Sequence, residues 1–261
     1  MILLTFDVEE FDIAEEYGQT VDLETKIRVS TEGLQKILRL LAKHDVKATF
    51  FCTAFFAEQQ PKLIAELAKT HELASHGYYH SSFEIAHLKT SREVLERLSG
   101  KPISGYRMAR LAPLDTAEVV NAGYVYDSSM NPTWLPGRYN NWHRPRTLHR
   151  IEQNRLWLLP TSVTPFLRFP LFWLSFKNLP LWAINWLSAR TLQHDGYLSL
   201  YYHPWEFSDL SAWQLPAYVK GTDGDELLHK LEAYILFLKK QGVPFGRVQD
   251  FLGQKNNITG I

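Results

Sequence analysis

The sequence predicts an α/β fold built on a parallel sheet. Short apolar runs alternate along the chain with amphipathic helical patterns, which is typical of parallel strands joined by crossover helices. Several of these runs end directly in acidic, basic or histidine side chains. The 261 residues are enough for one α/β barrel or for two small domains.

The first strand is expected in the apolar run of residues 2–6, which is typical of a strand buried on both faces. It runs into Asp7-Val8-Glu9-Glu10. Asp7 and Glu9 point to the same side if the strand stays extended there. Two crowded, buried carboxylates are costly unless they share a cation or a proton. The alternative is that the strand stops at Asp7 and that the acids are solvated.

The following elements are expected from periodicity and from cap and turn signals. Residues 10–29 have no clean period and predict a loop, and Ser30 or Thr31 is expected to cap the next helix. Pro61 opens a second helix, and Thr90 with Glu93 predicts a capping box for a third that ends near Gly100. Two more helices are expected at residues 115–122 and 227–240, and strands at 46–53, 72–75, 103–107, 124–127, 197–202 and 243–248. Residues 131–146, which are rich in Pro, Gly, Asn and Arg, predict an irregular loop.

The chain shows no internal repeat, no low-complexity tract and no linker, so we expect a single domain over residues 1–261 with an aromatic-rich insertion at about 156–192. Prolines interrupt this insertion and Arg168 and Lys177 charge it, so it is not a transmembrane helix. Core packing is one interpretation of its aromatic residues. The other is a peripheral membrane surface that meets a lipid-linked sugar, because aromatic and basic residues interleave there.

Composition excludes several classes of protein. The formal net charge is zero, which argues against nucleic acid as a partner. The single cysteine, Cys52, excludes a disulfide framework and favours a reducing compartment. Leu3-Leu4 is too short for a signal-peptide core and no Lys or Arg precedes it, so we expect a cytoplasmic protein.

Two histidines that follow the third expected strand suggest a metal site. His76 and His80 are four residues apart, a spacing that can present two nitrogen ligands to zinc, although such a pair can also be accidental. More informative is the ordered set of strand-end residues Asp7/Glu9, His76/His80, Arg107, Asp127 and His203. The carboxyl ends of parallel barrel strands open on one face, where this set could form a hydrolytic metal site.

The stretches that carry these residues resemble the ordered motifs of the polysaccharide deacetylases, the NodB-homology domains of carbohydrate esterase type. The resemblance spans about residues 1–205. Its five motifs are Thr5-Phe6-Asp7-Val8-Glu9, Ser75-His76-Gly77-Tyr78-Tyr79-His80, Gly105-Tyr106-Arg107, Tyr126-Asp127-Ser128-Ser129 and Leu200-Tyr201-Tyr202-His203-Pro204.

The resemblance implies a distorted (β/α) barrel of about seven parallel strands and a role for each motif residue. The roles that it implies are catalytic base for Asp7, divalent-metal ligands for Glu9, His76 and His80, support of the base for Arg107, general acid for His203, and orientation of that acid for Asp127. The implied ion is most readily Zn²⁺.

Two positions depart from the usual family pattern. Val8 separates the two acids, as in the acid-x-acid subgroup that includes intracellular and allantoinase-like members, and Glu10 is a second candidate for the ligand position of Glu9. The usual prolines do not follow Arg107, because Met108-Ala109-Arg110 stands there.

The expected function is therefore metal-dependent hydrolysis of an N-acetyl or similar N-acyl group on a carbohydrate or glycan precursor. A deformylase or an allantoinase-like C–N hydrolase on the same scaffold is one alternative. A catalytically silent carbohydrate-binding homologue is another.

Overall fold

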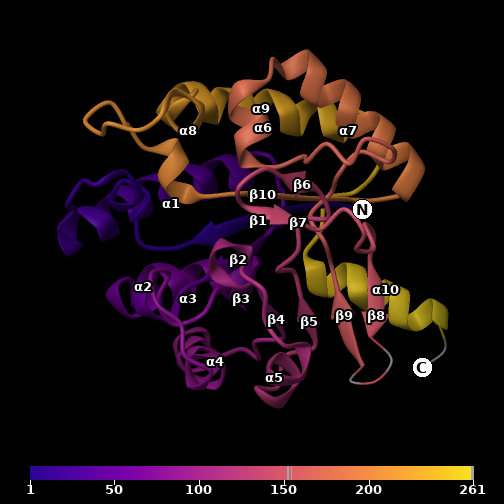
Figure 1. Cartoon of the computed structure of the whole chain (residues 1–261), viewed down its shortest axis with the longest axis horizontal. Coiled ribbons are helices and arrows are strands. Elements are labelled where there is room, and N and C mark those ends of the chain that lie inside the picture. Colours follow the sequence, from indigo (N-terminus) through magenta and orange to yellow (C-terminus); the bar gives the residue numbers. More distant parts are fainter. Residues whose placement is uncertain (152, 154, 260–261) are drawn as a thin grey trace.

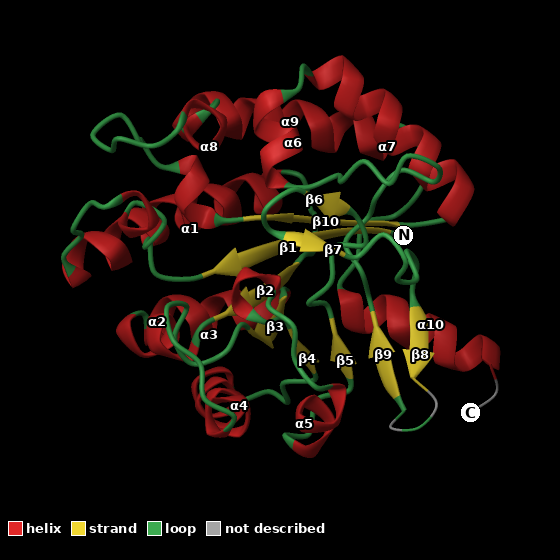
Figure 2. Cartoon of the chain, in the orientation of Figure 1, coloured by secondary structure: helices red, strands yellow, loops and turns green. Residues whose placement is uncertain are grey.

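The computed structural model describes residues 1–151, 153 and 155–259. A curved eight-stranded sheet runs through it in the order β10-β1-β2-β3-β4-β5-β9-β8 (Figures 1 and 2). Seven of these strands are parallel and β8 alone pairs antiparallel, with β9. The strands are β1 Ile2–Val8, β2 Thr49–Cys52, β3 Glu72–Ser75, β4 Gly105–Tyr106, β5 Tyr126–Asp127, β8 His149–Ile151, β9 Leu156–Leu158 and β10 Leu198–Tyr202. The predicted sheet of about seven parallel strands is confirmed.

Strand β1 lies in the interior of the sheet. Its seven residues are all buried, and it pairs with β10 on one side and with β2 on the other. Phe6 is in register with Tyr202 of β10 and with Phe50 of β2. This position explains why an unbroken apolar run leads to Asp7, since both faces of the strand are covered.

Helices cover both faces of the sheet. Figure 1 shows α1, α6, α7, α8 and α9 on one side and α2, α3, α4 and α5 on the other. The helices are α1 Leu23–Lys43, α2 Ala54–Gln59, α3 Pro61–Thr70, α4 Ala86–Ser99, α5 Thr116–Asn121, α6 Trp173–Asn178, α7 Leu181–Asp195, α8 Ala217–Lys220, α9 Gly224–Lys239 and α10 Val248–Thr259. Three 3-10 turns, η1 Glu15–Tyr17, η2 Ala109–Leu111 and η3 Pro204–Phe207, and the small hairpin β6 Trp134–Leu135 with β7 Tyr139–Asn140 complete the described part. Of the helices in that part, none is both long and apolar enough to cross a membrane.

Several predicted boundaries are wrong. Helix α1 starts at Leu23 rather than at Ser30 or Thr31, because the Asp22 carboxylate caps it by accepting the Thr25 N–H. The predicted loop, residues 10–29, therefore extends about two helical turns too far, since the helix begins at Leu23. Helix α4 starts at residue 86, so Thr90 lies inside the helix.

The strand predicted at residues 243–248 does not form. Phe245 makes a single bridge with Ile2, and α10 begins at Val248. Strand β1 already pairs with β10 on one side and, from Thr5 onward, with β2 on the other. The segment around Phe245 therefore bridges only Ile2, at the start of β1, and does not extend into a ladder.

A close contact fixes η3 against α1. A Cβ on Gly33 would lie 1.8 Å from the carbonyl oxygen of Pro204, so only glycine allows this approach. The Ser208 hydroxyl then donates to the Val29 carbonyl over 2.7 Å. Helix α1 thereby sets the position of the residues that follow His203.

Candidate metal centre and active site

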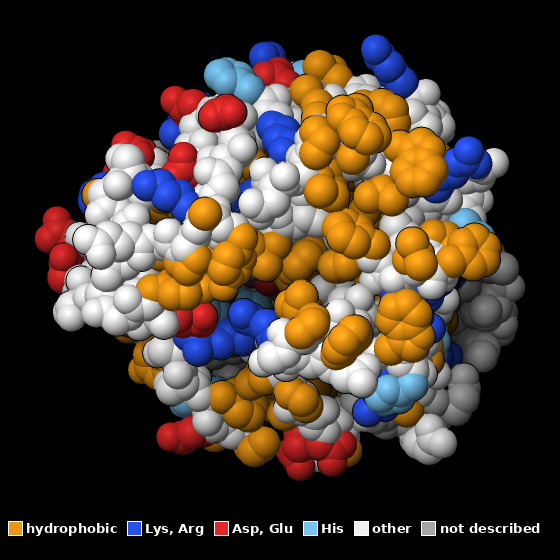
Figure 3. All heavy atoms as spheres, turned by 45° about the horizontal axis from the view of Figure 1, so that its top comes forward, with side chains coloured by type: hydrophobic (Ala, Val, Ile, Leu, Met, Phe, Trp, Pro, Cys, Tyr) orange, Lys and Arg blue, Asp and Glu red, His pale blue; other side chains and the backbone are white. Residues whose placement is uncertain are grey.

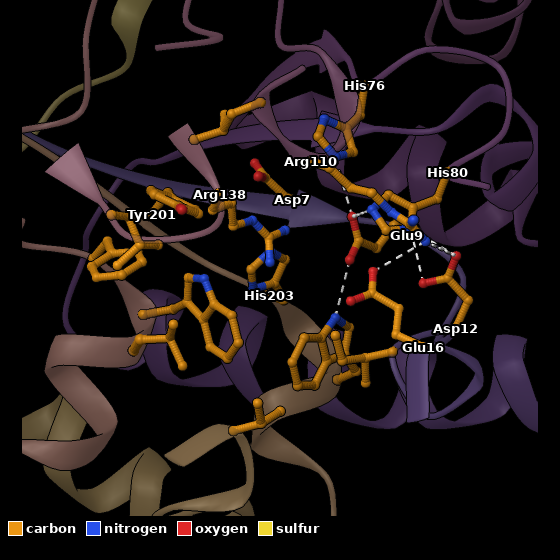
Figure 4. Close-up of a pocket in the computed structure, with 18 of the residues that line it drawn as sticks. Asp7, Glu9, Asp12, Glu16, His76, His80, Arg110, Arg138, Tyr201 and His203 are labelled. Atoms are coloured by element: carbon orange, nitrogen blue, oxygen red, sulfur yellow. Dashed lines mark hydrogen bonds and ion pairs between the residues drawn. The ribbon is translucent and has the colours of Figure 1, made fainter. Parts of the chain in front are cut away.

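The functional residues meet in one pocket at the carboxyl ends of the central strands. Asp7 and Glu9 reach it from the end of β1, His76 and His80 from the loop after β3, and His203 from the end of β10 (Figure 4). The sequence-based expectation that these strand ends converge describes this arrangement correctly, because parallel strands present the same end to one face.

Glu9, His76 and His80 form a compact group of potential metal ligands. One Glu9 oxygen, Oε2, lies 3.1 Å from His76 Nε2 and 3.2 Å from His80 Nε2. The three ligand atoms lie within 4.8 Å of one another. Glu10, the second candidate, turns away and accepts the Thr53 hydroxyl over 2.7 Å. The geometry therefore favours Glu9 as the carboxylate ligand.

Hydrogen bonds on the far side of each imidazole orient the two histidines. His76 Nδ1 lies 2.9 Å from the Arg107 carbonyl oxygen, and His80 Nδ1 lies 2.8 Å from the Asp12 carboxylate. Both partners accept a hydrogen bond from Nδ1–H, which leaves Nε2 available to a metal ion. Metal-ligating histidines commonly have such a carboxylate or carbonyl partner. The donor set therefore fits a divalent cation that takes nitrogen and oxygen ligands.

The charges in this group are strongly coupled. Burial by itself would raise the pKa of Glu9, but His80, His203 and His76 outweigh burial and hold that pKa well below its usual value. Burial would lower the pKa of His80, yet Glu9 and Asp12 raise it to about 9. Without a cation, the proton on His80 offsets part of the carboxylate charge, so the same pocket can exchange this proton for a metal ion.

Asp7 is held by a buried arginine. Arg107 Nη1 donates to Asp7 Oδ1 over 2.6 Å and to the Thr5 hydroxyl over 2.9 Å. The remaining guanidinium nitrogens donate to the carbonyl and the hydroxyl of Ser128, and the guanidinium lies over the Phe51 ring at 4.0 Å. With four of its five N–H donors hydrogen-bonded, Arg107 fixes one carboxylate oxygen of Asp7 beside the candidate metal ligands.

His203 is held by Glu206 and not by Asp127, which corrects the predicted pairing. Glu206 Oε1 accepts from His203 Nδ1 over 3.0 Å and from the His203 backbone N–H over 2.7 Å. Asp127 instead accepts the backbone N–H and the hydroxyl of Ser129. Burial lowers the pKa of His203, but Glu9, Glu206 and Asp7 raise it overall, which favours the protonated imidazole.

Glu206 and Asp12 escaped the sequence analysis. A signal for Glu206 is present, because His203-Pro204-Trp205-Glu206 has a proline at the first position of a helical turn and a glutamate at the third, the spacing of a capping box. Asp12 lies in a segment without periodicity, and no local pattern indicates it.

Trp205 is a further residue that the sequence did not indicate. Its indole Nε1 donates to Glu9 Oε1 over 3.1 Å, and its ring stacks on His203 with centroids 5.1 Å apart. It thus links the ligand carboxylate to the imidazole of His203, and it restrains both.

The aromatic-rich segment at residues 156–192 divides into two parts. Its start is β9 of the sheet, and Trp173 of α6 is buried with its ring 5.2 Å from that of His203. Other side chains of the segment face outward, with exposed fractions of 84% for Phe166, 80% for Leu167, 72% for Trp182 and 58% for Trp186. The core-packing interpretation therefore holds only for the inner part.

Comparison with known families agrees with this geometry. Residues 1–126 match the family model described as polysaccharide deacetylase. The predicted resemblance to these deacetylases is confirmed. The matched part contains Asp7, Glu9, His76, His80 and Arg107, whereas His203 and Glu206 lie beyond it. No curated protein sequence shows a significant match to the chain.

Several solved structures share the fold at low sequence identity. An allantoinase aligns with a TM-score of 0.66 at 15% identity, covering 98% of this chain and 90% of its own. A peptidoglycan N-acetylglucosamine deacetylase aligns with a TM-score of 0.53 at 18% identity, covering 95% and 86%. A pseudoenzyme of the CE4 family from Bacillus anthracis aligns with a TM-score of 0.53 at 15% identity, covering 96% and 64%.

Proposed function

We propose that this protein is a metal-dependent hydrolase that removes an N-acetyl or similar N-acyl group from a carbohydrate or glycan precursor. The carrying observation is the pocket in which Glu9, His76 and His80 converge beside an arginine-held Asp7 and a carboxylate-held His203. The deacetylase family match over residues 1–126 supports the same chemistry. We further propose that residues 1–261 act as one catalytic domain.

Each side chain has a distinct task in amide hydrolysis. A divalent ion held by Glu9, His76 and His80, for which we propose Zn²⁺, would polarise the substrate carbonyl and lower the pKa of water. Asp7, oriented by Arg107, accepts the proton of the attacking water.

His203 supplies the proton that the leaving group needs. An amine is a poor leaving group until it is protonated, and the raised pKa of His203 keeps its imidazole charged for that transfer. Glu206 holds Nδ1, so Nε2 is the nitrogen that donates. The proton taken by Asp7 and the proton given by His203 balance over the reaction.

Substitution of the base tests this assignment. Asp7→Asn should keep its metal and lower kcat by about 10² to 10⁴, the usual contribution of general acid–base catalysis. His80→Ala should lose metal affinity instead. Metal content by atomic absorption and steady-state kinetics separate the two effects, and normal turnover by Asp7→Asn would remove Asp7 as the base.

The substrate bond is tested on the purified protein with acetylated and formylated amino sugars. Acetate release supports the deacetylase, and faster formate release supports a deformylase. Ureide hydrolysis without either would favour an allantoinase-like enzyme. A protein that binds sugar but holds no metal and shows no metal-dependent turnover would be the silent homologue.

We also propose that the enzyme works in the cytoplasm at a membrane surface, on a sugar carried by a lipid. The supporting observation is the exposed aromatic surface formed by Phe166, Leu167, Trp182 and Trp186. Figure 3 shows hydrophobic side chains (orange) gathered on one face of the molecule. The same face contains a hollow with Lys or Arg (blue) and His (pale blue) side chains. Arg190 is exposed on the same helix as the two tryptophans, and Arg168 lies over the Trp142 ring, as at interfaces with anionic lipid.

Co-sedimentation with vesicles tests this surface. The protein should pellet with vesicles that contain anionic phospholipid, and the double variant Trp182→Ser/Trp186→Ser should stay in the supernatant. Phe83→Ser, which removes an aromatic side chain outside this surface, is the control. A wild-type protein that remains in the supernatant with and without vesicles would rule out the membrane contact.

A further inference from the structure

A buried lysine stands behind the pair of His203 and Glu206. Lys177, on α6, has a fully buried side chain, and its Nζ lies 3.9 Å from Glu206 Oε2, which is also fully buried. Within the described residues neither atom has a hydrogen-bond partner. Lys177 also faces the Trp205 ring, with Nζ 5.7 Å from its centroid.

The two oxygens of Glu206 therefore face two different basic groups. Oε1 accepts the hydrogen bonds from the backbone N–H and the ring Nδ1–H of His203, while Oε2 faces the ammonium of Lys177. A carboxylate removed from water is costly unless a cation compensates it. The imidazole of His203 alone cannot supply this compensation throughout a reaction in which it gives up its proton.

We propose that Lys177 is a positioning residue for proton donation: its ammonium holds the buried side chain of Glu206 in place from the Oε2 side, and Glu206 in turn holds His203 with Nε2 directed to the leaving amine. This inference rests on the proposed function, in which His203 is the general acid. It also gives α6 a role beyond packing, since that helix carries both Trp173, whose ring touches His203, and Lys177.

The chain offers a matched control for the loss of a partly buried ammonium. Lys230 of α9 packs against the same helix, and its Nζ donates to the carbonyl oxygens of Lys177 and Leu179 over 3.3 and 2.8 Å. Its ammonium has no contact with Glu206. Lys230→Met therefore removes an ammonium that contacts α6 but leaves the charge beside the Glu206 carboxylate unchanged.

Substrates with different leaving groups reveal the effect. For an N-acetylglucosamine oligosaccharide, which needs a protonated leaving amine, Lys177→Met should lower kcat by about tenfold or more, part of the roughly 10² to 10⁴ that general acid–base catalysis contributes. KM and metal content should not change. For p-nitrophenyl acetate, whose leaving group departs without a proton, the rate should stay within about threefold. Lys230→Met should behave as wild type with both substrates.

Two further measurements test the role of Lys177 even if Lys177→Met does not fold or shows a mixed effect: the kinetics of a double variant and the NMR resonance of His203. Lys177→Met leaves a buried carboxylate without its cation and can fail to fold, so the double variant Lys177→Met/Glu206→Gln, which removes both charges, is compared with Glu206→Gln alone. If Lys177 acts only through Glu206, the double variant should fold and lose no more amide turnover than Glu206→Gln does. In the proton spectrum the His203 Nδ1–H resonance, assigned by its absence in His203→Gln, should be present in Lys230→Met and lost or shifted in Lys177→Met.

The outcomes are distinguishable. Equal loss with amide and ester in Lys177→Met, or an amide turnover of the double variant clearly below that of Glu206→Gln alone, would overturn the role of Lys177. Absence of turnover by the wild type on every acylated sugar would instead refute the proposed function, and an unchanged His203 resonance in Lys177→Met would then refute the positioning separately.

Discussion

His203 and Glu206 are only three residues apart, and the Glu206 carboxylate closes a short turn by accepting the backbone N–H and the ring Nδ1–H of His203. These local hydrogen bonds do not depend on the packing of distant strands. Asp127 is on β5, five strands from β10 in the sheet order, and it binds Ser129 without taking part in holding His203.

The pairing of His203 with Glu206 predicts that one conservative substitution lowers turnover and that another does not. Glu206→Gln should lower kcat on an acylated sugar by about 10- to 100-fold, because a neutral amide no longer stabilises the charged imidazole. Asp127→Asn keeps the oxygen that accepts from Ser129 and should stay within about threefold of wild type. Kinetics on metal-loaded protein decide the matter, and a matching loss in both variants would restore the predicted role of Asp127.

His80, a proposed metal ligand, should make metal binding dependent on pH. In the metal-free protein its pKa is raised to about 9 by Glu9 and Asp12, which outweigh the effect of burial. A metal ion must displace this proton, so the apparent affinity should fall by about tenfold for each pH unit below about 9. Competition with a chromophoric chelator between pH 6.5 and 9 measures the slope. Constant affinity over that range would show that His80 is not a ligand.

At the scale of elements, α1 packs closely against η3 because Gly33 has no side chain. Gly33→Ala would drive a Cβ to 1.8 Å from the Pro204 carbonyl oxygen, so the backbone beside His203 must move. Overpacking of this kind should cost about 1 to 3 kcal/mol in the free energy of unfolding and should also lower kcat.

Gly253 of α10 is the matched control for this substitution. A Cβ there would meet no atom within 4 Å, so Gly253→Ala should leave activity unchanged and slightly raise stability. Urea unfolding and kinetics on both variants provide the comparison. Equal stability for the two would mean that α1 and η3 can separate without cost.

The elements that the sequence predicted well are those whose pattern comes from burial. Strand β3 matches its predicted bounds, residues 72–75, because each of its four residues is buried. Helix α1 was predicted too short because a single capping carboxylate, Asp22, starts it ahead of the strongest apolar period. Asp12 and Lys177 act through distant partners, His80 and Glu206, and no local pattern contains such partners.

At the scale of the whole molecule, the proposed metal joins two separate parts of the chain. Glu9 follows β1, whereas His76 and His80 follow β3, so an ion bound by all three stabilises the folded state and not the unfolded chain. Free metal at 100 times its Kd should raise the free energy of unfolding by about 2.7 kcal/mol. Removal by a chelator should lower Tm by several degrees, measured by calorimetry. His80→Ala should show no such shift.

The order of the parallel sheet also governs when the pocket becomes complete. Strand β1 lies between β2, which follows it closely in the chain, and β10, which is separated from it by almost 200 residues. As the polypeptide leaves the ribosome at about 5–20 residues per second, the three metal ligands emerge many seconds before His203 and Glu206. Nascent chains can thus hold a complete set of metal ligands while they still lack the proton donor, so metal loading can precede catalytic competence during synthesis.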